Sequence, residues 1–182
     1  DKDLLVGEAY GVLKYFQNTG TALNPQFTAP QVNPFGLVST YDLAIPAFAD
    51  LDGDGDMDLL VGERYGSMQY FQNIGSALIP QFAAPQVNSF GLDSTYSLAF
   101  PAFADLDGDG DIDLLVGEYY GVMQYFRNTG SISNPQFAAP MPNPFGLDSA
   151  YVFAAPAFAD LDGDGDMDLL VGEYYGSMQY FQ

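Results

Sequence analysis

The sequence predicts an all-β repeat protein in which each repeat forms one small sheet of four antiparallel strands. A nine-residue acidic motif, Asp-x-Asp-Gly-Asp-Gly-Asp-x-Asp, occurs three times at a spacing of 55 residues. Residues 56–110 and 111–165 are identical at 40 of 55 positions aligned without gaps. The apolar residues fall in short runs that are typical of strands, and no segment has a convincing helical period. A fixed period of this length indicates a repeat architecture.

The second repeat shows the expected order of strands. Residues 46–50, Pro-Ala-Phe-Ala-Asp, predict a short first strand that enters the acidic loop. Residues 58–63 predict the second strand and residues 67–72 the third, and the Tyr-Gly turn between them indicates a hairpin. A glycine-containing loop leads to a fourth strand at residues 81–85, and residues 88–100 form a long connector.

These strands are apolar on both faces. Leu59, Leu60 and Val61 are consecutive in the second strand, and Met68, Tyr70 and Phe71 occupy both faces of the third. Such a sheet must be covered on both sides, which sheets stacked face to face achieve without helices. Four strands and a connector in 55 residues match the size of a β-propeller blade. We therefore expect propeller blades, with the small residues of the first strand near the axis.

The period also predicts how the chain divides. We expect a partial blade with its connector at residues 1–45 (inner strand missing), complete blades at residues 46–100 and 101–155, and a partial blade at residues 156–182. The pattern of residues 3–17 recurs at residues 168–182. The segment is therefore expected to be a window from a longer array of near-identical repeats.

The acidic motif predicts a calcium loop. Its five carboxylates repel one another unless a hard cation lies among them, and calcium accepts about six to eight oxygen ligands in a flexible shell. By the logic of an EF-hand loop, Asp50, Asp52 and Asp54 donate side-chain oxygens and Asp56 its backbone carbonyl, while Asp58 completes the shell. The glutamate that ends an EF-hand loop is absent, so no helix-loop-helix hand is expected.

The predicted ligands are the alternate acids of three complete loops and of one partial loop at the start of the chain: Asp50, Asp52, Asp54, Asp56, Asp58, Asp105, Asp107, Asp109, Asp111, Asp113, Asp160, Asp162, Asp164, Asp166, Asp168, Asp1 and Asp3. Magnesium is the alternative ion, but it prefers a rigid octahedron and keeps its waters. An acidic turn without metal is the remaining alternative, because Asp and Gly are common turn residues. Three near-identical copies favour the cation.

Composition restricts the possible functions. The 182 residues include 20 Asp and 4 Glu against 4 basic residues, and the formal charge of −20 disfavours nucleic acid and anionic membranes as partners. Cysteine and histidine are absent, so disulfides, thiol chemistry and a Ser-His-Asp triad are excluded. No apolar run reaches the roughly 18 residues of a membrane span, and the N-terminus does not have the pattern of a signal peptide. Weak calcium modules work where calcium is abundant, which favours an extracellular location.

The loops at residues 50–58, 105–113 and 160–168, each followed by Leu-Leu-Val-Gly, resemble the calcium-binding FG-GAP and VCBS-type repeats. The preceding Phe-Ala-Asp-Leu, the Tyr-Phe-x-Asn-x-Gly of the third strand and the Asn-Pro-Phe-Gly-Leu of residues 143–147 extend the resemblance over essentially the whole chain. The resemblance implies propeller blades with calcium between the first two strands. It also implies a large secreted or surface protein of a bacterium.

Two other sets of residues are candidates for function. A glutamate precedes the hairpin turn of every repeat, where it could be catalytic as in glycoside hydrolysis or a structural partner of the hairpin: Glu8, Glu63, Glu118 and Glu173. Catalytic sites are usually single, so the repetition favours the structural role. Tyrosines cluster at the hairpin turns, where they could stack on sugars, join neighbouring molecules or cover blade edges: Tyr65, Tyr119, Tyr120, Tyr174 and Tyr175.

We expect a non-catalytic, calcium-stabilised structural or adhesive module at the cell surface or outside the cell, which mediates assembly or surface interaction. The expected partners are identical repeats in the same or neighbouring chains, as a closed ring or a filament, and also glycans. Nucleic acid and membrane insertion are not expected. A carbohydrate-binding, lectin-like propeller is the alternative, and a glycoside hydrolase is a more distant one.

Overall fold

The computed structural model describes residues 2–148 and 152–182, which form four antiparallel sheets in chain order. The first sheet contains β1 (Leu4–Gly7), β2 (Leu13–Phe16) and β3 (Gln31–Val32). The second contains β4 (Ile45–Ala49), β5 (Asp58–Gly62), β6 (Met68–Phe71) and β7 (Gln86–Val87).

The other two sheets repeat this plan. The third contains β8 (Phe100–Ala104), β9 (Asp113–Gly117), β10 (Met123–Phe126) and β11 (Met141–Pro142). The fourth contains β12 (Ala155–Ala159), β13 (Asp168–Gly172) and β14 (Met178–Phe181). The predicted all-β class, with antiparallel sheets of three or four strands, is confirmed.

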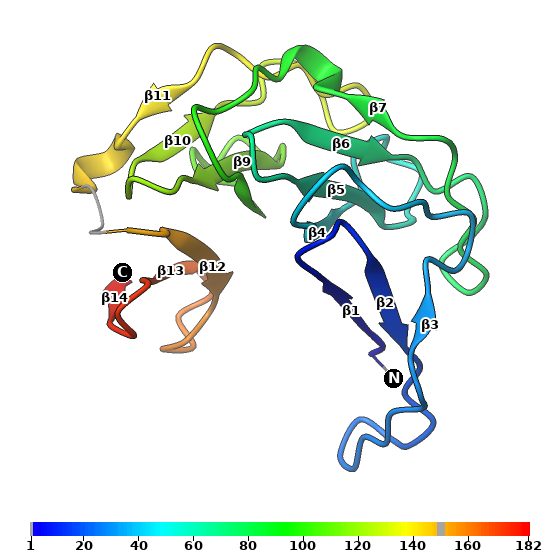
Figure 1. Ribbon diagram of the computed structural model, residues 1–182. Helices are drawn as coiled ribbons and strands as arrows, with labels where there is room; N and C mark the ends of the chain where they lie inside the picture. The colour runs from blue at the N-terminus through cyan, green and yellow to red at the C-terminus, as the bar shows by residue number, and fades with distance from the viewer. Residues whose placement is uncertain (1, 149–151) are drawn as a thin grey trace.

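The sheets follow one another around an open arc, with the first and fourth sheets at its two ends (Figure 1). The first strands lie on the inner side, where β4 contacts β8 and β8 contacts β12. The short strands β7 and β11 lie on the outer side (Figure 1). Within the described part of the chain, no helix has the length and apolar character that crossing a membrane requires.

Both faces of the central sheets are buried, as the sequence predicts. All five residues of β5 are buried, and so are all five of β9. Leu59 and Val61 belong to the core shared with the first sheet, whereas Leu60 and Met68 belong to the core shared with the third. Because successive residues of a strand point to opposite faces, one short apolar run contributes to two cores.

Glycine permits the close approach of the hairpin to the connector that leads into the next sheet. A Cβ on Gly62, at the end of β5, would lie 2.0 Å from the carbonyl oxygen of Ala99. Gly66 in the hairpin turn has a φ of +81°, and its added Cβ would lie 2.1 Å from the carbonyl oxygen of Thr95. Ala99 also donates its N–H to the carbonyl oxygen of Glu63 at 3.1 Å. The Gly-Glu-x-Tyr-Gly segment therefore forms a turn and also holds the connector that enters the next sheet.

The predicted fourth strand is wrong in position. The strand that pairs with β6 is β7, which begins after the predicted residues 81–85. Within that predicted segment, the N–H of Phe82 donates to the carbonyl oxygen of Phe35 in the preceding repeat at 2.7 Å, and its ring enters the core between the first two sheets. The segment thus connects two repeats, and within its own repeat it forms only an isolated antiparallel bridge between Phe82 and Asn73 instead of a strand.

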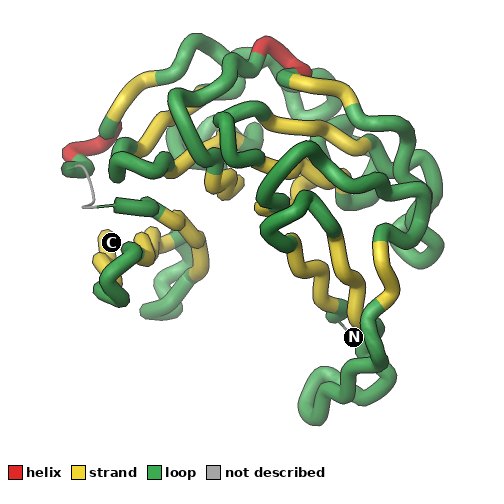
Figure 2. The backbone as a smooth tube through the Cα atoms, viewed as in Figure 1, coloured by secondary structure: helices red, strands yellow, loops and turns green. Residues whose placement is uncertain are grey.

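Among the described residues, the connectors contain two short helical turns that the sequence does not predict. They are η1 (Ser89–Gly91) and η2 (Pro144–Gly146), and both lie on the outer side of the arc (Figure 2). Phe90 and Phe145 have positive φ values inside these turns, so neither turn is a regular helix. The boundaries predicted for the first three strands of the second repeat agree with the structure to within one residue.

Candidate metal centres

Each complete acidic motif lies in the loop between the first and second strands of a sheet. Asp50 follows β4, and the last acid of the motif, Asp58, is the first residue of β5. The equivalent loops join β8 to β9 and β12 to β13. The chain therefore presents the same acidic loop three times, at the same place in each repeat.

The loop is organised by hydrogen bonds between its own carboxylates and backbone. The two carboxylate oxygens of Asp50 accept the N–H groups of Gly53 at 2.8 Å and Gly55 at 3.0 Å. Asp54 accepts the N–H of Asp56 at 2.9 Å. Gly55 has a φ of +92°, a conformation that favours glycine, so the backbone can wrap around the Asp50 carboxylate.

Asp58 is the buried anchor of the loop, with a side chain that is 1% exposed. One carboxylate oxygen accepts the N–H of Asn73 at 2.7 Å. The other accepts the hydroxyl of Tyr70 at 3.0 Å and the N–H of Leu51 at 3.1 Å. This carboxylate therefore ties together the loop, the third strand and the segment that follows it.

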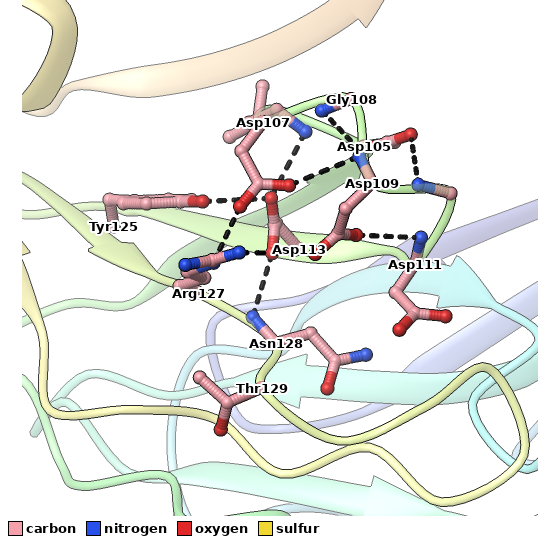
Figure 3. A network of polar contacts seen from close by, with 12 residues as sticks. Asp105, Asp107, Gly108, Asp109, Asp111, Asp113, Tyr125, Arg127, Asn128 and Thr129 are labelled. Carbon is pink, nitrogen blue, oxygen red and sulfur yellow. Dashed lines mark hydrogen bonds and ion pairs between the residues drawn. The ribbon is translucent and has the colours of Figure 1, made fainter.

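The third repeat reproduces this anchor. Asp113 accepts the N–H of Asn128 at 2.7 Å, the hydroxyl of Tyr125 at 2.9 Å and the N–H of Leu106 at 3.1 Å (Figure 3). The Tyr-Phe-x-Asn motif thus supplies two donors to the last aspartate of the acidic loop. Their role as donors was not predicted, although the motif itself was noted in every repeat.

Burial raises the pKa of both Asp58 and Asp113, and the hydrogen bonds from the neighbouring Asn and Tyr residues only partly offset this effect. Burial is likewise the largest cause of the raised pKa of the partner hydroxyls of Tyr70 and Tyr125. A raised carboxyl pKa means that burial penalises the ionised form. A cation beside the carboxylate would offset that penalty.

Three acidic clusters among the described residues have a geometry that suits a metal ion. In each cluster one carboxylate oxygen from every residue lies within 4.8 Å of the others: Asp50, Asp52 and Asp54; Asp105, Asp107 and Asp113; Asp160, Asp162 and Asp168. Two oxygens bound to one calcium ion lie at most about 5 Å apart, because each bond is about 2.3–2.6 Å long. The spacing and the all-oxygen donor set fit a hard cation such as calcium.

The clusters contain some of the predicted ligands and not others. The second repeat brings Asp54 into its cluster, whereas the third and fourth repeats use the buried anchors Asp113 and Asp168. The side chains of Asp56, Asp111 and Asp166, at the position expected to offer only a backbone carbonyl, lie outside the clusters, and so do those of Asp58, Asp109 and Asp164. The ligand assignment itself remains a prediction.

The partial loop at the start of the chain retains its anchor. Asp3 accepts the N–H of Asn18 at 2.7 Å and the hydroxyl of Tyr15 at 2.6 Å, as Asp58 does with its own partners. Burial and the hydrogen bond to Asp3 raise the pKa of Tyr15 to about 12. Asp1, the other predicted ligand of this loop, lies outside the described residues.

One residue that contacts the loops differs between repeats, and the sequence analysis did not identify it. Gln72 donates from Nε2 to Asp52 at 2.7 Å in the second repeat. The third repeat has Arg127 at this position, and its guanidinium pairs with Asp107 at 2.5 Å and Asp109 at 3.3 Å (Figure 3). The N–H of Asp111 and then Arg127 lower the pKa of Asp109. The replacement of Gln by Arg at one position of a repeated motif was the sequence signal that could have indicated this contact.

The repeated glutamates lie at the other end of the second strand, in the hairpin. Glu63 is 3% exposed and accepts the N–H of Tyr41 at 2.8 Å, the amide of Gln69 at 2.7 Å and the hydroxyl of Ser67. Glu118 accepts the equivalent amide of Gln124 at 3.1 Å. These contacts fit the structural role that the repetition favours.

The hairpin tyrosines of the third and fourth repeats form a continuous row of aromatic rings with Phe153. Tyr119 contacts both Tyr120, with ring centres 4.9 Å apart, and Phe153, at 4.8 Å. Phe153 stacks on Tyr174 at 5.3 Å, and Tyr174 contacts Tyr175 at 5.3 Å. We call these five residues the aromatic row. Tyr120, Tyr174 and Tyr175 are 68%, 65% and 78% exposed.

Repeated antiparallel sheets, each with one acidic loop, define a class of repeat proteins with candidate metal loops. Comparison with protein families places the chain within this class: the FG-GAP-like repeat matches residues 1–61 and 105–171, which is more than half of the chain. The chain therefore belongs to the FG-GAP-like repeat family, as its resemblance predicted. A search of curated proteins found no match.

Proposed function

We propose that the chain is a non-catalytic, calcium-stabilised structural or adhesive repeat module that works outside the cell or at its surface. Its sheets act as propeller-type blades. The observation that carries this proposal is the acidic cluster that recurs at the same place in three repeats. Membership of the FG-GAP-like repeat family supports it. Weak calcium loops are occupied where the calcium concentration is high, which is outside the cell.

Calcium would stabilise the fold because the loop exists only in the folded chain. The second loop gathers the carboxylates of Asp50, Asp52 and Asp54 within 4.8 Å, and their repulsion opposes folding. A bound cation turns this repulsion into attraction. At a calcium concentration of 100 times the dissociation constant, linkage contributes about 2.7 kcal/mol per independent site.

The test is thermal unfolding in saturating calcium and in excess chelator, followed by circular dichroism at constant ionic strength. We expect chelation to lower the melting temperature by about 10 °C or more, since three sites act together and about 1 kcal/mol corresponds to about 2–4 °C in a chain of this size. Magnesium at the same concentration is the control and should restore only part of the loss. An unchanged melting temperature in chelator would refute the calcium proposal.

The absence of catalysis is part of the proposal and rests on the placement of the acids. Asp58 and Glu63 are separated by the length of β5, about 16 Å between their Cα atoms at about 3.3 Å per residue. Paired carboxylates of glycosidases lie roughly 5–9.5 Å apart. Turnover of a glycoside that disappears in Glu118→Gln would contradict this part of the proposal.

Identical repeats are the proposed partners. The last sheet exposes 67% of Met178 and 48% of Tyr180, while the equivalent Met68 and Tyr70 are 0% and 4% exposed beneath the third sheet. Stacking of another repeat would cover this face as the third sheet covers the second. Sedimentation of the chain should show association that Met178→Glu abolishes. A monomer at every concentration would refute association between chains.

Carbohydrate binding is a second candidate function, supported by the aromatic row. Exposed tyrosine rings present flat apolar faces beside hydroxyl groups, which suits stacking on sugar rings. Affinity electrophoresis through neutral polysaccharides should show retardation that Tyr119→Ala with Tyr120→Ala removes. Tyr10→Ala is the matched control, because Tyr10 is an 85% exposed tyrosine in the turn between β1 and β2, outside the aromatic row. Equal mobility of all three proteins would exclude this function for the polysaccharides tested.

A further inference from the structure

The acidic loop of the second repeat is in contact with a segment of the third repeat. We call this segment, residues 128–136, the finger; it lies between β10 and β11. A Cβ added to Gly53 in the acidic loop would lie 2.8 Å from the Cα of Ser133 and 3.1 Å from the carbonyl oxygen of Ile132. The finger therefore lies directly against the backbone of the loop.

Little space remains between the two segments. The cavity between them has a volume of only about 10 Å³, and its lining includes Asp50 and Leu51 from the loop and Ile132 and Pro135 from the finger. Pro135 is buried, although its neighbours in the finger are exposed. A cavity of this volume holds about one water molecule at most, so the finger and the loop are closely packed.

The finger is held in shape from its base. The side-chain oxygen of Asn128 accepts the N–H of Gly130 at 3.0 Å and the N–H of Gln136 at 3.0 Å. Thr129 donates its N–H to the carbonyl oxygen of Gln136 at 2.8 Å. One asparagine side chain thus joins the two ends of the finger.

The base of the finger is also tied to the third repeat's own acidic loop. The backbone N–H of Asn128 donates to Asp113, the buried anchor of that loop, at 2.7 Å (Figure 3). The finger therefore runs from the anchor of one acidic cluster to the backbone of the neighbouring one, and it cannot tilt without disturbing one of these contacts.

The position of Gly53 explains why the contact matters for a cation. Gly53 lies between Asp52 and Asp54, and these two carboxylates cluster with that of Asp50. Gly53, Asp54 and Gly55 are exposed, so the loop has few packing contacts of its own. Ordering such a segment opposes binding through conformational entropy. A contact that fixes Gly53 removes part of this opposition before a cation binds.

We propose that the finger of the third repeat is a positioning element for the cation site of the second repeat. It acts by holding Gly53, so that the carboxylates on either side of this residue stay together, and not as a ligand. By linkage, a cation that orders the loop also favours the seated finger, so calcium in the second repeat holds the third repeat against it. This second step rests on the proposed calcium function, whereas the positioning contact needs no metal.

Calcium titration by calorimetry of a chain in which only the second loop is active tests the positioning role. Asp105→Ala and Asp160→Ala disable the other two complete loops. In this background Asn128→Ala removes the side-chain acceptor of the finger and keeps the backbone N–H that donates to Asp113. We expect Asn128→Ala to weaken calcium binding by about tenfold, because the loop must then be ordered by the cation alone.

Asn18→Ala in the same background is the matched control. In the equivalent segment of the first repeat, the side-chain oxygen of Asn18 accepts the N–H of Gly20 at 3.0 Å and of Gln26 at 2.9 Å. The two variants thus lose the same hydrogen bonds, and both should lower the melting temperature. Only Asn128→Ala should change the calcium affinity of the second loop. Equal affinities of the two variants would overturn the positioning role.

A second pair of variants tests the contact and leaves the finger intact. Gly53→Ala places a methyl group against Ser133, whereas Gly108→Ala places one at the equivalent position of the third loop, where no described atom lies within 4 Å. The two glycines have φ values of +73° and +76°, so the backbone strain is nearly the same. With only its own loop active, Gly53→Ala should lose about tenfold more calcium affinity than Gly108→Ala. Equal losses would refute the role of the contact.

Hydrogen exchange measures the order of the loop without metal and the effect of calcium on the finger. In chelator, Asn128→Ala should speed the exchange of the Gly55 N–H by about fivefold relative to Asn18→Ala, since the loop opens more often. Calcium added to the chain with only the second loop active should slow the exchange of the Thr129 N–H in the finger. The equivalent N–H of Thr19 in the first repeat should be unaffected.

The outcomes distinguish this inference from the proposed function. If the chain binds calcium and Asn128→Ala binds it as tightly as Asn18→Ala, the positioning role is wrong and the calcium function stands. If the chain binds no calcium and Asn128→Ala still speeds the exchange of Gly55, the calcium function and the calcium-dependent step are wrong and the positioning contact stands. Exchange of Gly55 at the same rate in both variants would show that the loop keeps its shape without the finger and would overturn the inference.

Discussion

The acidic loops of the second and third repeats share their backbone hydrogen bonds and their buried anchor but differ in the residue after the Tyr-Phe pair. Gln72 gives the second loop a neutral hydrogen bond to Asp52. Arg127 places a guanidinium against Asp107 and Asp109 in the third loop. This one sequence difference therefore supplies a permanent cation to the third loop and none to the second.

This difference separates the contacts that hold the loop in place from the positive charge that neutralises its carboxylates. The anchor is the same in both repeats, so the loop path does not depend on the charge of this residue. Neutralisation can come from a metal ion or from a side chain. In the third repeat Arg127 offsets part of the carboxylate repulsion without metal, and calcium must compete with it. We expect the third loop to be the less calcium-dependent of the two.

The largest effect should come from the shared anchor. Asp58→Ala and Asp113→Ala each leave a buried backbone N–H, a buried tyrosine hydroxyl and a leucine N–H without their acceptor. Unsatisfied buried donors cost about 1–3 kcal/mol each, but each variant also removes a carboxylate whose burial is unfavourable. We therefore expect a net loss of about 2–4 kcal/mol of unfolding free energy. Urea unfolding in chelator measures this without a contribution from metal.

The two anchor variants should lose nearly the same stability, because the contacts of the two carboxylates are the same. Asp58→Asn keeps one acceptor oxygen and should lose less than Asp58→Ala. A loss below about 1 kcal/mol for either alanine variant would show that water replaces the carboxylate and that the anchor is not what holds the loop.

The fold was predictable where a short run of residues is compatible with only one environment. Leu59, Leu60 and Val61 can be buried together only if both faces of the strand are covered, and that is how β5 lies. The fourth strand was misplaced because Phe82 reads as a strand residue, yet its N–H bonds to Phe35 of the preceding repeat. Partners so far away in sequence cannot be inferred from the local pattern.

The ligand type of the site was predictable from the sequence, but the contacts that bury the anchor and that distinguish the loops were not. The alternation of aspartates indicated an oxygen-rich loop, since spacing and residue type are both visible in the sequence. That Asp58 is an anchor buried beneath Tyr70 and Asn73 depends on how β6 pairs with β5, which the motif alone does not show. The contact between Arg127 and Asp107 depends on the same pairing.

A moderate effect is expected from exchanging the two residues that distinguish the loops. Arg127→Gln should raise the calcium affinity of the third loop by about tenfold, because a positive charge within about 4 Å of the ligands is removed from a partly solvated site. Gln72→Arg should lower the affinity of the second loop by a similar factor. Terbium luminescence or calorimetry of proteins with the other loops disabled by Asp-to-Ala changes measures each site. Equal affinities before and after the exchange would show that Arg127 leaves the loop when calcium binds.

The smallest effect is expected on stability in chelator. Arg127→Gln removes the built-in cation, so the third loop keeps its repulsion and the melting temperature should fall by about 1–3 °C at low salt, a small loss because the arginine side chain is 53% exposed. The loss should vanish near 1 M salt, where the Debye length is about 3 Å, and be largest near 0.01 M, where it is about 30 Å. Gln72→Arg should show the opposite sign with the same salt dependence. A loss that is equal at both salt concentrations would mean that Arg127 acts through packing and hydrogen-bond geometry, and the electrostatic difference between the two loops would then be refuted.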